Sequence, residues 1–420
     1  MKKVSQTLTA LLLSSIIVSS VFATENHPNT STADYELEKV LIFSRHGLRS
    51  PEIDPKEMEK YSPQTWAKWD VPPGYLTAKG TVLETYFGQY LGQWLEDKGL
   101  LTIERCASGE GIFVYANGMQ RTVATGQAIL AGAFAGCNVQ LQHHGKISSK
   151  KDPIFNTKAH NPSKELIESA KSNVDLNALQ KKLAPNYALL SELIDYKNSP
   201  NCLQNDKCDL GEKTGEYSIE DGKSVKITGS ISTSKKIINA LLLAHYVGKP
   251  SSEIANGKVD SEEKWRAINE IKNEYYRTLF KNNKVLAQNA SYPLLEFIQQ
   301  QLNSENKISV LVGHDSNVVG LLASLGVAPY ELEDSLENTP IGGKLMFEVW
   351  KHKPSGKLKF KLDYVYQSTE QLVKLTPLSL ATPPKQTALT LEACTKDESG
   401  FCDYEQFQKV LSEGIENGKK

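Results

Sequence analysis

The sequence predicts an α/β fold, in which helices flank a central mixed sheet and a smaller all-α domain is inserted. Three short apolar runs each break into a polar turn and are followed by a segment of helical periodicity, which is the pattern of strand–helix units. Between the second and third units, strand-like runs largely vanish and helical periodicity dominates. A length of 420 residues also favours more than one lobe.

The three strand–helix units are the basis of the predicted sheet. The first strand covers residues 39–43 and breaks directly into a charged turn. The second covers 112–116 and precedes a helix over 120–134. The third covers 308–312 and precedes a helix over 317–325. Since ligands of α/β sheets bind at the carboxyl ends of the strands, we expect the chemistry in the turns that follow these three runs.

The other elements complete this layout. One broad apolar stripe predicts a helix over 78–98, and alternating residues over 344–350 and 358–366 predict a hairpin added to the sheet. The insert is expected to contain helices over 163–182, 187–196, 235–247 and 261–279. We therefore predict a catalytic α/β domain from residues 24–146 and 291–420, with an α-helical domain inserted at 147–290.

The amino terminus has the features of an export signal. Lys2 and Lys3 precede a largely apolar run over 8–22. Ala23 follows the run and is a small residue of the kind that signal peptidase cuts after. A membrane anchor is the alternative, but four serines interrupt the run and it is short for a bilayer span. We predict that residues 1–23 are a signal peptide and that the mature protein is periplasmic or secreted, with no membrane attachment after cleavage.

Six cysteines are expected to form disulfides in an exported protein. They are neighbours along the chain: Cys106 and Cys137, Cys202 and Cys208, Cys394 and Cys402. Fifteen connectivities are possible, and pairing of nearest neighbours is the simplest. Zinc is the alternative, but these pairs lack the two-residue gap of familiar zinc sites and no histidine lies close enough to complete one. We expect no metal site.

The segment Arg45-His46-Gly47-Leu48-Arg49-Ser50-Pro51 is the most distinctive feature of the chain. Two guanidinium groups flank one imidazole at the end of a strand, and the planar fork of arginine suits phosphate oxygens. The positive charges also favour a neutral imidazole, whose lone pair stays available in acid. Gly47 allows close backbone approach and Pro51 stiffens the exit. The alternative is a basic turn on the surface whose histidine has no catalytic role.

Two further turns supply candidate residues. His314 and Asp315 follow the third strand, and a bound phosphate beside Asp315 would raise its pKa enough for it to act as an acid. The alternative is that Asp315 only caps the next helix, which is compatible with catalysis. Arg121 opens the helix after the second strand, where a third cation would converge on the same anion.

Several other functions are disfavoured by what the sequence lacks. It has no Walker loop, no Gly-x-Ser-x-Gly elbow and no His-Glu-x-x-His motif. The formal net charge is −1, and without Lys2 and Lys3 it becomes about −3. No basic block or aromatic ladder suggests nucleic-acid binding.

The motif Arg45-His46-Gly47-x-Arg49-x-Pro51, with the late His314-Asp315, resembles the histidine acid phosphatase family, branch 2 of the histidine phosphatase superfamily. The likeness covers nearly the whole mature chain. It implies an α/β domain with an inserted α domain, no cofactor, and a small phosphate monoester as substrate. The resemblance also implies roles for six residues: His46 as phosphohistidine nucleophile, Asp315 as proton donor, and Arg45, Arg49, Arg121 and His314 as phosphate ligands.

Within this family, residues 115–117, 120–125 and 314–317 are most similar to the glucose-1-phosphatases. Gly47 departs from that pattern, which has asparagine at this position, and Glu220 is the candidate for the substrate-binding glutamate of the helical domain. Hydrolysis of glucose 1-phosphate is therefore the expected activity, and phytase or broad acid phosphatase activity is the alternative. A phosphotransferase and a non-catalytic phosphate-binding protein are the rivals from other classes.

Overall fold

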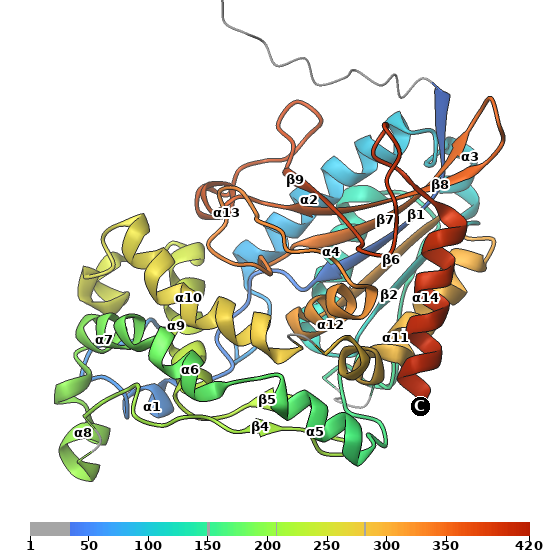
Figure 1. The fold of residues 1–420 in the computed structure, drawn as a ribbon. Helices are drawn as coiled ribbons and strands as arrows, with labels where there is room; N and C mark the ends of the chain where they lie inside the picture. Colours follow the sequence, from blue (N-terminus) through green and yellow to red (C-terminus); the bar gives the residue numbers. More distant parts are fainter. Residues whose placement is uncertain (1–33, 149–151, 207, 281–282) are drawn as a thin grey trace, which may run out of the picture. The chain divides into compact units, whose positions relative to one another are not determined.

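A mixed eight-stranded sheet forms the centre of the fold in the computed structural model, which describes residues 34–148, 152–206, 208–280 and 283–420 (Figure 1). The predicted signal peptide lies outside the described residues. The strands run in the order β10-β8-β7-β1-β6-β2-β3, with β9 beside β8. Their bounds are β1 (Tyr35–Arg45), β2 (Ile112–Ala116), β3 (Leu141–His143), β6 (Ile308–Gly313), β7 (Lys344–His352), β8 (Leu358–Tyr366), β9 (Lys385–Leu389) and β10 (Cys402–Asp403).

The sheet buries both faces because alternate residues of its central strands point to opposite sides. On β1, Val40 and Ile42 belong to one hydrophobic core, whereas Leu41 and Phe43 belong to the other. Helices α2 (Ala78–Asp97) and α4 (Gln120–Ala133) cover the first face. Helices α11 (Lys284–Asn303), α12 (Asp315–Leu325) and α14 (Tyr404–Lys419) cover the second. The continuous apolar runs of the sequence are thus strands buried on both sides.

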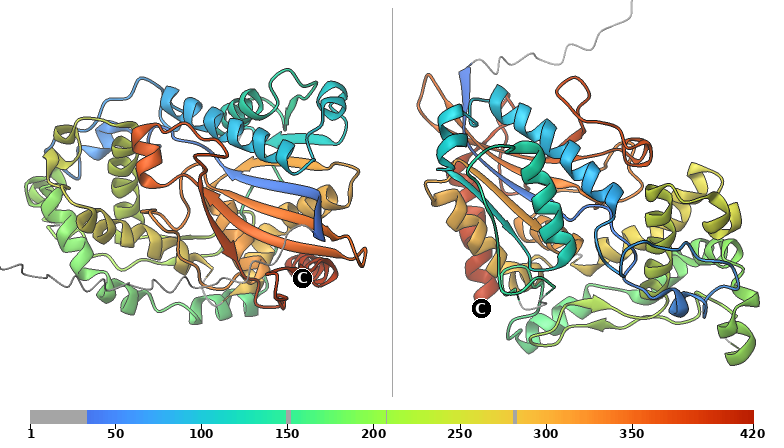
Figure 2. Two further views of the ribbon diagram at one scale, coloured as in Figure 1. Left: turned by 90° about the horizontal axis from the view of Figure 1, so that it is seen from above. Right: turned by 180° about the vertical axis from the view of Figure 1, so that it is seen from behind.

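Helices α2 and α4 lie side by side (Figure 2). Their close approach depends on Gly132 of α4, because a Cβ at this position would collide with the backbone carbonyl of Thr85 on α2. The short helices α1 (Pro55–Met58), α3 (Ile103–Ser108) and α13 (Thr369–Lys374) lie in the connections.

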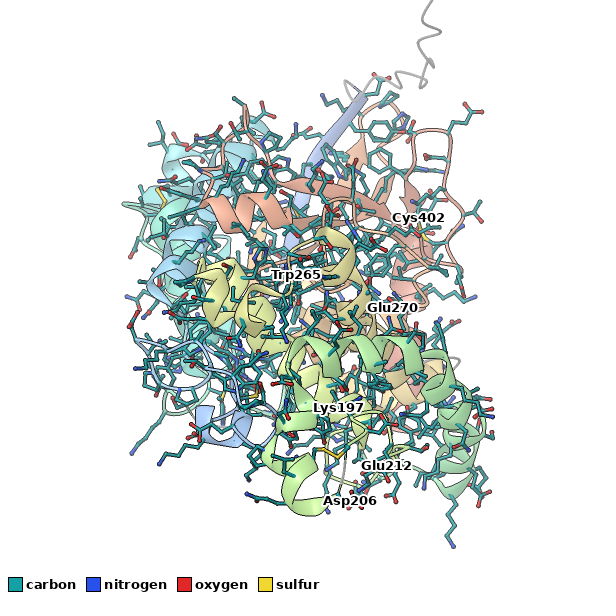
Figure 3. The ribbon with its side chains drawn as sticks, turned by 90° about the vertical axis from the view of Figure 1, so that its left-hand side faces the viewer. Lys197, Asp206, Glu212, Trp265, Glu270 and Cys402 are labelled. Carbon is teal, nitrogen blue, oxygen red and sulfur yellow. A yellow bond between two sulfur atoms is a disulfide. The ribbon has the colours of Figure 1, made fainter. Side chains whose placement is uncertain are left out.

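The region between β3 and α11 is mainly helical and surrounds a third hydrophobic core. Its helices are α5 (Lys164–Ser172), α6 (Leu176–Lys182), α7 (Ala184–Leu193), α8 (Pro200–Asn205), α9 (Ser230–Val247) and α10 (Glu262–Leu279). The rings of His245 on α9 and Trp265 on α10 lie 4.8 Å apart. Figure 3 shows the helical region from the side and labels Trp265. A two-stranded hairpin of β4 (Tyr217–Ser218) and β5 (Lys226–Ile227) also lies here.

The α/β prediction with a central mixed sheet is confirmed, and the hairpin of β7 and β8 is found as expected. The prediction of one helix over 163–182 is wrong, because the chain forms α5 and α6 instead. Asp175 interrupts it: its side chain accepts a hydrogen bond from the backbone N–H of Ala178 and so caps a new helix. The limits of the inserted domain, 147–290, stay a prediction.

All six cysteines form disulfides between chain neighbours: Cys106–Cys137, Cys202–Cys208 and Cys394–Cys402. Figure 3 shows the last pair at Cys402, beside the sheet. Within the described ranges, no group of three or more His, Cys, Asp or Glu side chains is arranged to hold a metal ion. In the same ranges, no helix combines the length and the apolar character that crossing a membrane would require.

A buried carboxylate in the sheet predicts pH-dependent stability. Burial and the nearby charge of Asp363 raise the pKa of Glu348, on β7, to about 7. The folded protein therefore holds this proton more strongly than the unfolded chain does, so this contribution to stability is complete below the unfolded pKa of 4.5 and is lost as the pH rises through 7.

We expect Glu348→Gln, which keeps an acceptor for the indole N–H of Trp350, to raise the free energy of unfolding by roughly 3 kcal/mol at pH 8 and to change it little at pH 4. Denaturant unfolding at the two pH values measures this. Glu36→Gln, at an exposed position of β1, is the control. An equal effect at both pH values would contradict the prediction.

Candidate active site

The carboxyl ends of three strands meet at one edge of the sheet. β6 pairs in parallel with β1 on one side and with β2 on the other. β1 leads into His46, and β2 leads into α4, which carries Arg121 in its first turn. β6 leads into His314 and Asp315 at the start of α12. Residues far apart in the sequence therefore emerge at the same place.

His46 is 1% exposed and lies at the centre of this cluster. Its Nδ1 lies 2.9 Å from the carbonyl oxygen of Gly47, so Nδ1 carries the hydrogen and the lone pair resides on Nε2. Burial, together with the positive charges of Arg121, Arg49 and Arg45, holds the pKa of the imidazole well below 6.5. The ring is thus neutral even in acid, and its Nε2 lone pair is not taken up by a proton.

Gly47 is required by close packing. A Cβ at this position would lie 2.6 Å from Cγ of the buried Glu84, whose carboxylate forms an ion pair with Lys344 at 2.8 Å. The backbone N–H of Gly47 donates to Thr125 Oγ1 on α4 at 2.9 Å. The motif thus packs against α2 and α4, and a side chain at residue 47 would require the Glu84 side chain to move.

Arg45 is buried in a network of charges. Its guanidinium donates to Glu337 at 3.1 Å and to the backbone carbonyl of Thr339, and it lies 3.4 Å from Asp315. Lys272 of α10 also forms an ion pair with Glu337. Although burial opposes the charged form, the two carboxylates raise the pKa of Arg45. Glu337 thus compensates two buried cations, one from the sheet domain and one from the helical region.

Arg49 and Arg121 share a different carboxylate. Glu52 lies 2.9 Å from Arg121 Nη2 and 4.0 Å from Arg49 Nη2. Arg49 also donates to the carbonyl of Ser50 at 2.8 Å. Burial lowers the pKa of Arg121 to about 10, so its guanidinium stays charged in neutral and acid solution.

The cluster has unused hydrogen-bonding capacity. Four buried nitrogens of this cluster have no hydrogen-bond partner within the described part of the chain: Nε of Arg45, Arg49 and Arg121, and Nδ1 of His314. Buried polar groups normally have partners, so spare donors concentrated around one imidazole indicate a binding site. Guanidinium donors in this number suit an anion with several oxygens, such as a phosphoryl group.

Asp315 faces the cluster from α12. Tyr276 donates its hydroxyl hydrogen to Asp315 Oδ2 at 2.7 Å, and the backbone N–H of Ser316 donates to Oδ1 at 2.8 Å. Burial opposes ionisation of this carboxyl, but the charge of Arg45 and the Tyr276 hydrogen bond bring its pKa well below 3.8. Asp315 is therefore a carboxylate in the free protein.

His314 completes the cluster as the first residue after β6. Its ring lies edge-on to that of His46, with centroids 5.6 Å apart, and its backbone N–H donates to Asn317 Oδ1 at 3.0 Å. Burial and the charge of Arg121 lower the pKa of His314 to about 3. The ring is thus neutral above pH 3 and can donate one hydrogen bond to an anion.

Glu220 stands apart from these residues. It lies between β4 and β5, is 53% exposed, and interacts with Ser218 and Lys223. The interactions that we find for it in the described residues do not reach His46 or Asp315. Its role in substrate binding stays a prediction.

Several residues of this cluster were not predicted from the sequence: Glu52, Lys235, Lys272, Tyr276 and Glu337. Lys235 of α9 has its ammonium 3.7 Å above the ring of Tyr275, and burial lowers its pKa to about 8. Glu52 directly follows Pro51, the last residue of the motif, and this closeness in the sequence could have indicated that it belongs to the site. The other four carry no local signal because they come from the helical region or from the loop before β7.

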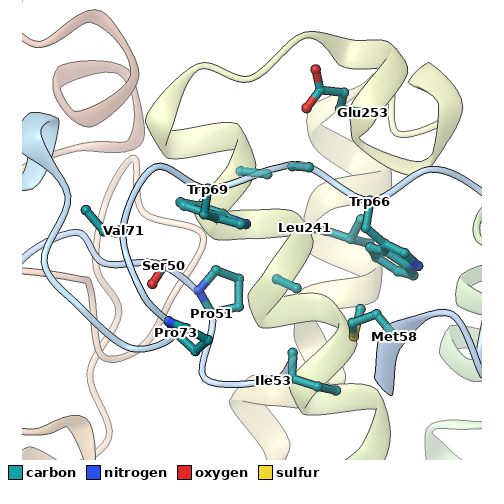
Figure 4. A pocket seen from close by; sticks show the side chains of 13 residues that line it. Ser50, Pro51, Ile53, Met58, Trp66, Trp69, Val71, Pro73, Leu241 and Glu253 are labelled. Carbon is teal, nitrogen blue, oxygen red and sulfur yellow. The ribbon is translucent and has the colours of Figure 1, made fainter. Parts of the chain in front are cut away.

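A separate cavity of about 170 Å³ lies behind the motif loop, between residues 50–73 and α9 (Figure 4). Its wall is mainly apolar and includes Trp66, Trp69, Met58 and Leu241. None of the clustered catalytic candidates lines it. The cavity therefore borders the back of the loop rather than the charged site.

Comparison with known proteins identifies the family. Residues 36–376 match the model of the histidine phosphatase superfamily, branch 2. The chain belongs to this family. It is a histidine acid phosphatase, a hydrolase of phosphate monoesters.

The relatives of this histidine acid phosphatase span almost its whole length. It is 38% identical to a glucose-1-phosphatase of Providencia rettgeri, covering 91% of this chain and 93% of the relative. A glucose-1-phosphatase of Salmonella typhimurium is 34% identical, with 91% and 94% covered. The apo structure of Hafnia alvei phytase superposes with a TM-score of 0.84 at 28% identity, covering 93% of this chain and 99% of that one.

The charge network around Glu337 predicts a large loss of stability on truncation. Glu337→Ala leaves Arg45 and Lys272 as buried cations without their shared carboxylate, so we expect the free energy of unfolding to fall by about 3–5 kcal/mol. Denaturant unfolding at pH 6 measures this.

Glu333→Ala, which removes an exposed carboxylate paired with Lys385, is the matched control and should lower that free energy by less than about 1 kcal/mol. Adding Lys272→Met to Glu337→Ala should recover part of the loss, because it removes one of the two uncompensated cations. A small loss for Glu337→Ala would show that the network is not needed for folding.

Proposed function

We propose that this histidine acid phosphatase hydrolyses glucose 1-phosphate to glucose and phosphate, through a phosphohistidine at His46. The observation that carries the proposal is the neutral, buried imidazole of His46 among four nitrogens that have no other partner. Identities of 38% and 34% to two glucose-1-phosphatases support the choice of substrate.

The first half of the reaction transfers the phosphoryl group. Arg45, Arg49, Arg121 and His314 hold the non-bridging oxygens, and Nε2 of His46 attacks phosphorus. The N–P bond forms while the P–O bond to the sugar breaks, and Asp315 gives its proton to the departing oxygen. This proton is available because the negative charge of bound phosphate offsets that of the arginines and raises the pKa of Asp315.

The second half releases phosphate. Asp315, now a carboxylate, takes a proton from water, and the water oxygen attacks phosphorus. The N–P bond breaks and returns His46 in its neutral form. The hydrogen bond from Tyr276 to Asp315 Oδ2 fixes the carboxyl group for both steps.

We also propose that the protein is exported, to the periplasm or beyond the cell. The predicted signal peptide over residues 1–23 and three disulfides support this location.

The proposed roles predict that the two central residues respond differently to the leaving group. His46→Ala should abolish turnover of both glucose 1-phosphate and p-nitrophenyl phosphate, because no N–P bond can form. Asp315→Asn should lower kcat/KM, which reports transfer of the phosphoryl group to His46, by about 10²–10⁴-fold for glucose 1-phosphate and far less for the aryl phosphate, because p-nitrophenolate leaves without a proton.

Steady-state rates on both substrates from pH 3 to 8 test these roles. Wild-type activity on glucose 1-phosphate should fall as pH rises, as Asp315 in the complex loses its proton, and Asp315→Asn should lack that decline. Equal losses on both substrates would contradict the role of Asp315 as the acid.

The substrate is tested by comparing kcat/KM on glucose 1-phosphate, phytate and p-nitrophenyl phosphate, with and without a chelator. We expect the highest value for glucose 1-phosphate and no effect of the chelator. A preference for phytate would make the protein a phytase, and equal values would make it a broad acid phosphatase. Trapping of labelled phosphohistidine separates an enzyme from a phosphate-binding protein.

A further inference from the structure

Glu52 lies at the mouth of the site on a firmly held backbone. Its neighbours Pro51 and Ile53 are buried and line the cavity behind the loop (Figure 4), whereas the Glu52 side chain is 56% exposed. The carbonyl of Pro51 accepts a hydrogen bond from the N–H of Gly74 at 3.0 Å. The backbone at Glu52 is therefore held in place by its neighbours, whereas its side chain is exposed.

The carboxylate of Glu52 contacts two of the guanidinium groups to which we assign phosphate binding. Oε1 lies 2.9 Å from Arg121 Nη2, and Oε2 lies 4.0 Å from Arg49 Nη2. Two oxygens of one anion thus bridge two arginines, as two oxygens of a phosphate would. When a substrate binds, its phosphate therefore meets two arginines that already share an anion, the carboxylate of Glu52.

The titratable groups around Glu52 come from four segments of the chain. Arg49 lies on its own loop, Arg121 on α4, His314 and Asp315 at α12, and Lys235 on α9. The charge of Arg49 most strongly lowers the pKa of Glu52, against an opposing effect of burial. The group is thus ionised at the mildly acid pH where such a phosphatase acts.

We infer that Glu52 is a specificity-determining residue, which competes with substrate phosphate for Arg49 and Arg121 and selects substrates that carry a single phosphate. This inference rests on the proposed function and names its substrate class. After one phosphate displaces the carboxylate, the fixed Cα keeps that charge at the mouth. A second or third phosphate on the same substrate is then repelled by it.

The test compares Glu52→Gln with Asp54→Asn. Both changes remove one negative charge from the same loop and keep the size of the side chain, but Asp54 accepts a local hydrogen bond from the N–H of Lys56 and forms no ion pair with an arginine among the described residues. We expect Glu52→Gln to lower KM for phytate by about tenfold and for glucose 1-phosphate by about twofold, because repulsion grows with the number of phosphates. Asp54→Asn should leave both values within error.

Direct binding gives a second readout that does not require turnover. Calorimetry at pH 5.5 should show that Glu52→Gln binds inorganic phosphate about threefold more tightly than the wild type, and myo-inositol hexakis sulphate about tenfold more tightly. Raising the salt concentration should shrink both differences. If the substitution changed only the stability of the protein, the ratio of the affinities for the two probes would be the same as in the wild type.

The outcomes separate the two proposals. If neither variant nor the wild type turns over any phosphate monoester while Glu52→Gln still tightens both probes, the proposed reaction fails and the role of Glu52 stands. If the wild type hydrolyses glucose 1-phosphate but Glu52→Gln leaves both KM values and both affinities within twofold, the role of Glu52 is overturned. Equal tightening for both probes would overturn the charge selectivity.

Discussion

The parallel pairing of β6 with both β1 and β2 is the constraint on which this site depends. Strands that run in the same direction end at the same edge, so three turns from distant parts of the chain open onto one place. The pairing is itself stabilised by two apolar layers, since alternate residues of β1 and β6 face α2 and α4 on one side and α11 and α12 on the other. Burial of the sheet thus sets the geometry of the charged residues at its end.

The concentration of positive charge at this edge has two consequences. It keeps His46 neutral, which preserves a lone pair for nucleophilic attack, and it would be unfavourable in the interior without compensation. Glu337 compensates Arg45 and Lys272 in the buried half of the cluster, whereas Glu52 pairs with Arg49 and Arg121 in the exposed half. We expect the buried carboxylate to stabilise the fold, and we propose that the exposed one lies where the substrate phosphate binds.

The sequence predicted the sheet and much of the site from local signals. Apolar runs over 39–43, 112–116 and 308–312 gave the strands that flank the site, and the residues directly after them include His46 and Asp315. The helix over 163–182 failed because a single capping residue, Asp175, outweighed the continuous periodicity. Disulfides between chain neighbours were the simplest expectation: Cys202–Cys208 and Cys394–Cys402 close short loops, whereas Cys106 and Cys137 are 31 residues apart.

By itself, the sequence determined the order of strands and helices and the motif that carries His46, since periodicity and turn residues act over a few positions. Only the tertiary structure decided that Tyr276 holds Asp315, that Glu337 serves two cations and that Glu52 bridges two arginines. The first two contacts join residues 39 to 292 positions apart, and the third needs Arg121 from another strand–helix unit. Charge pairs of this kind depend on distances in space, which local sequence patterns do not encode.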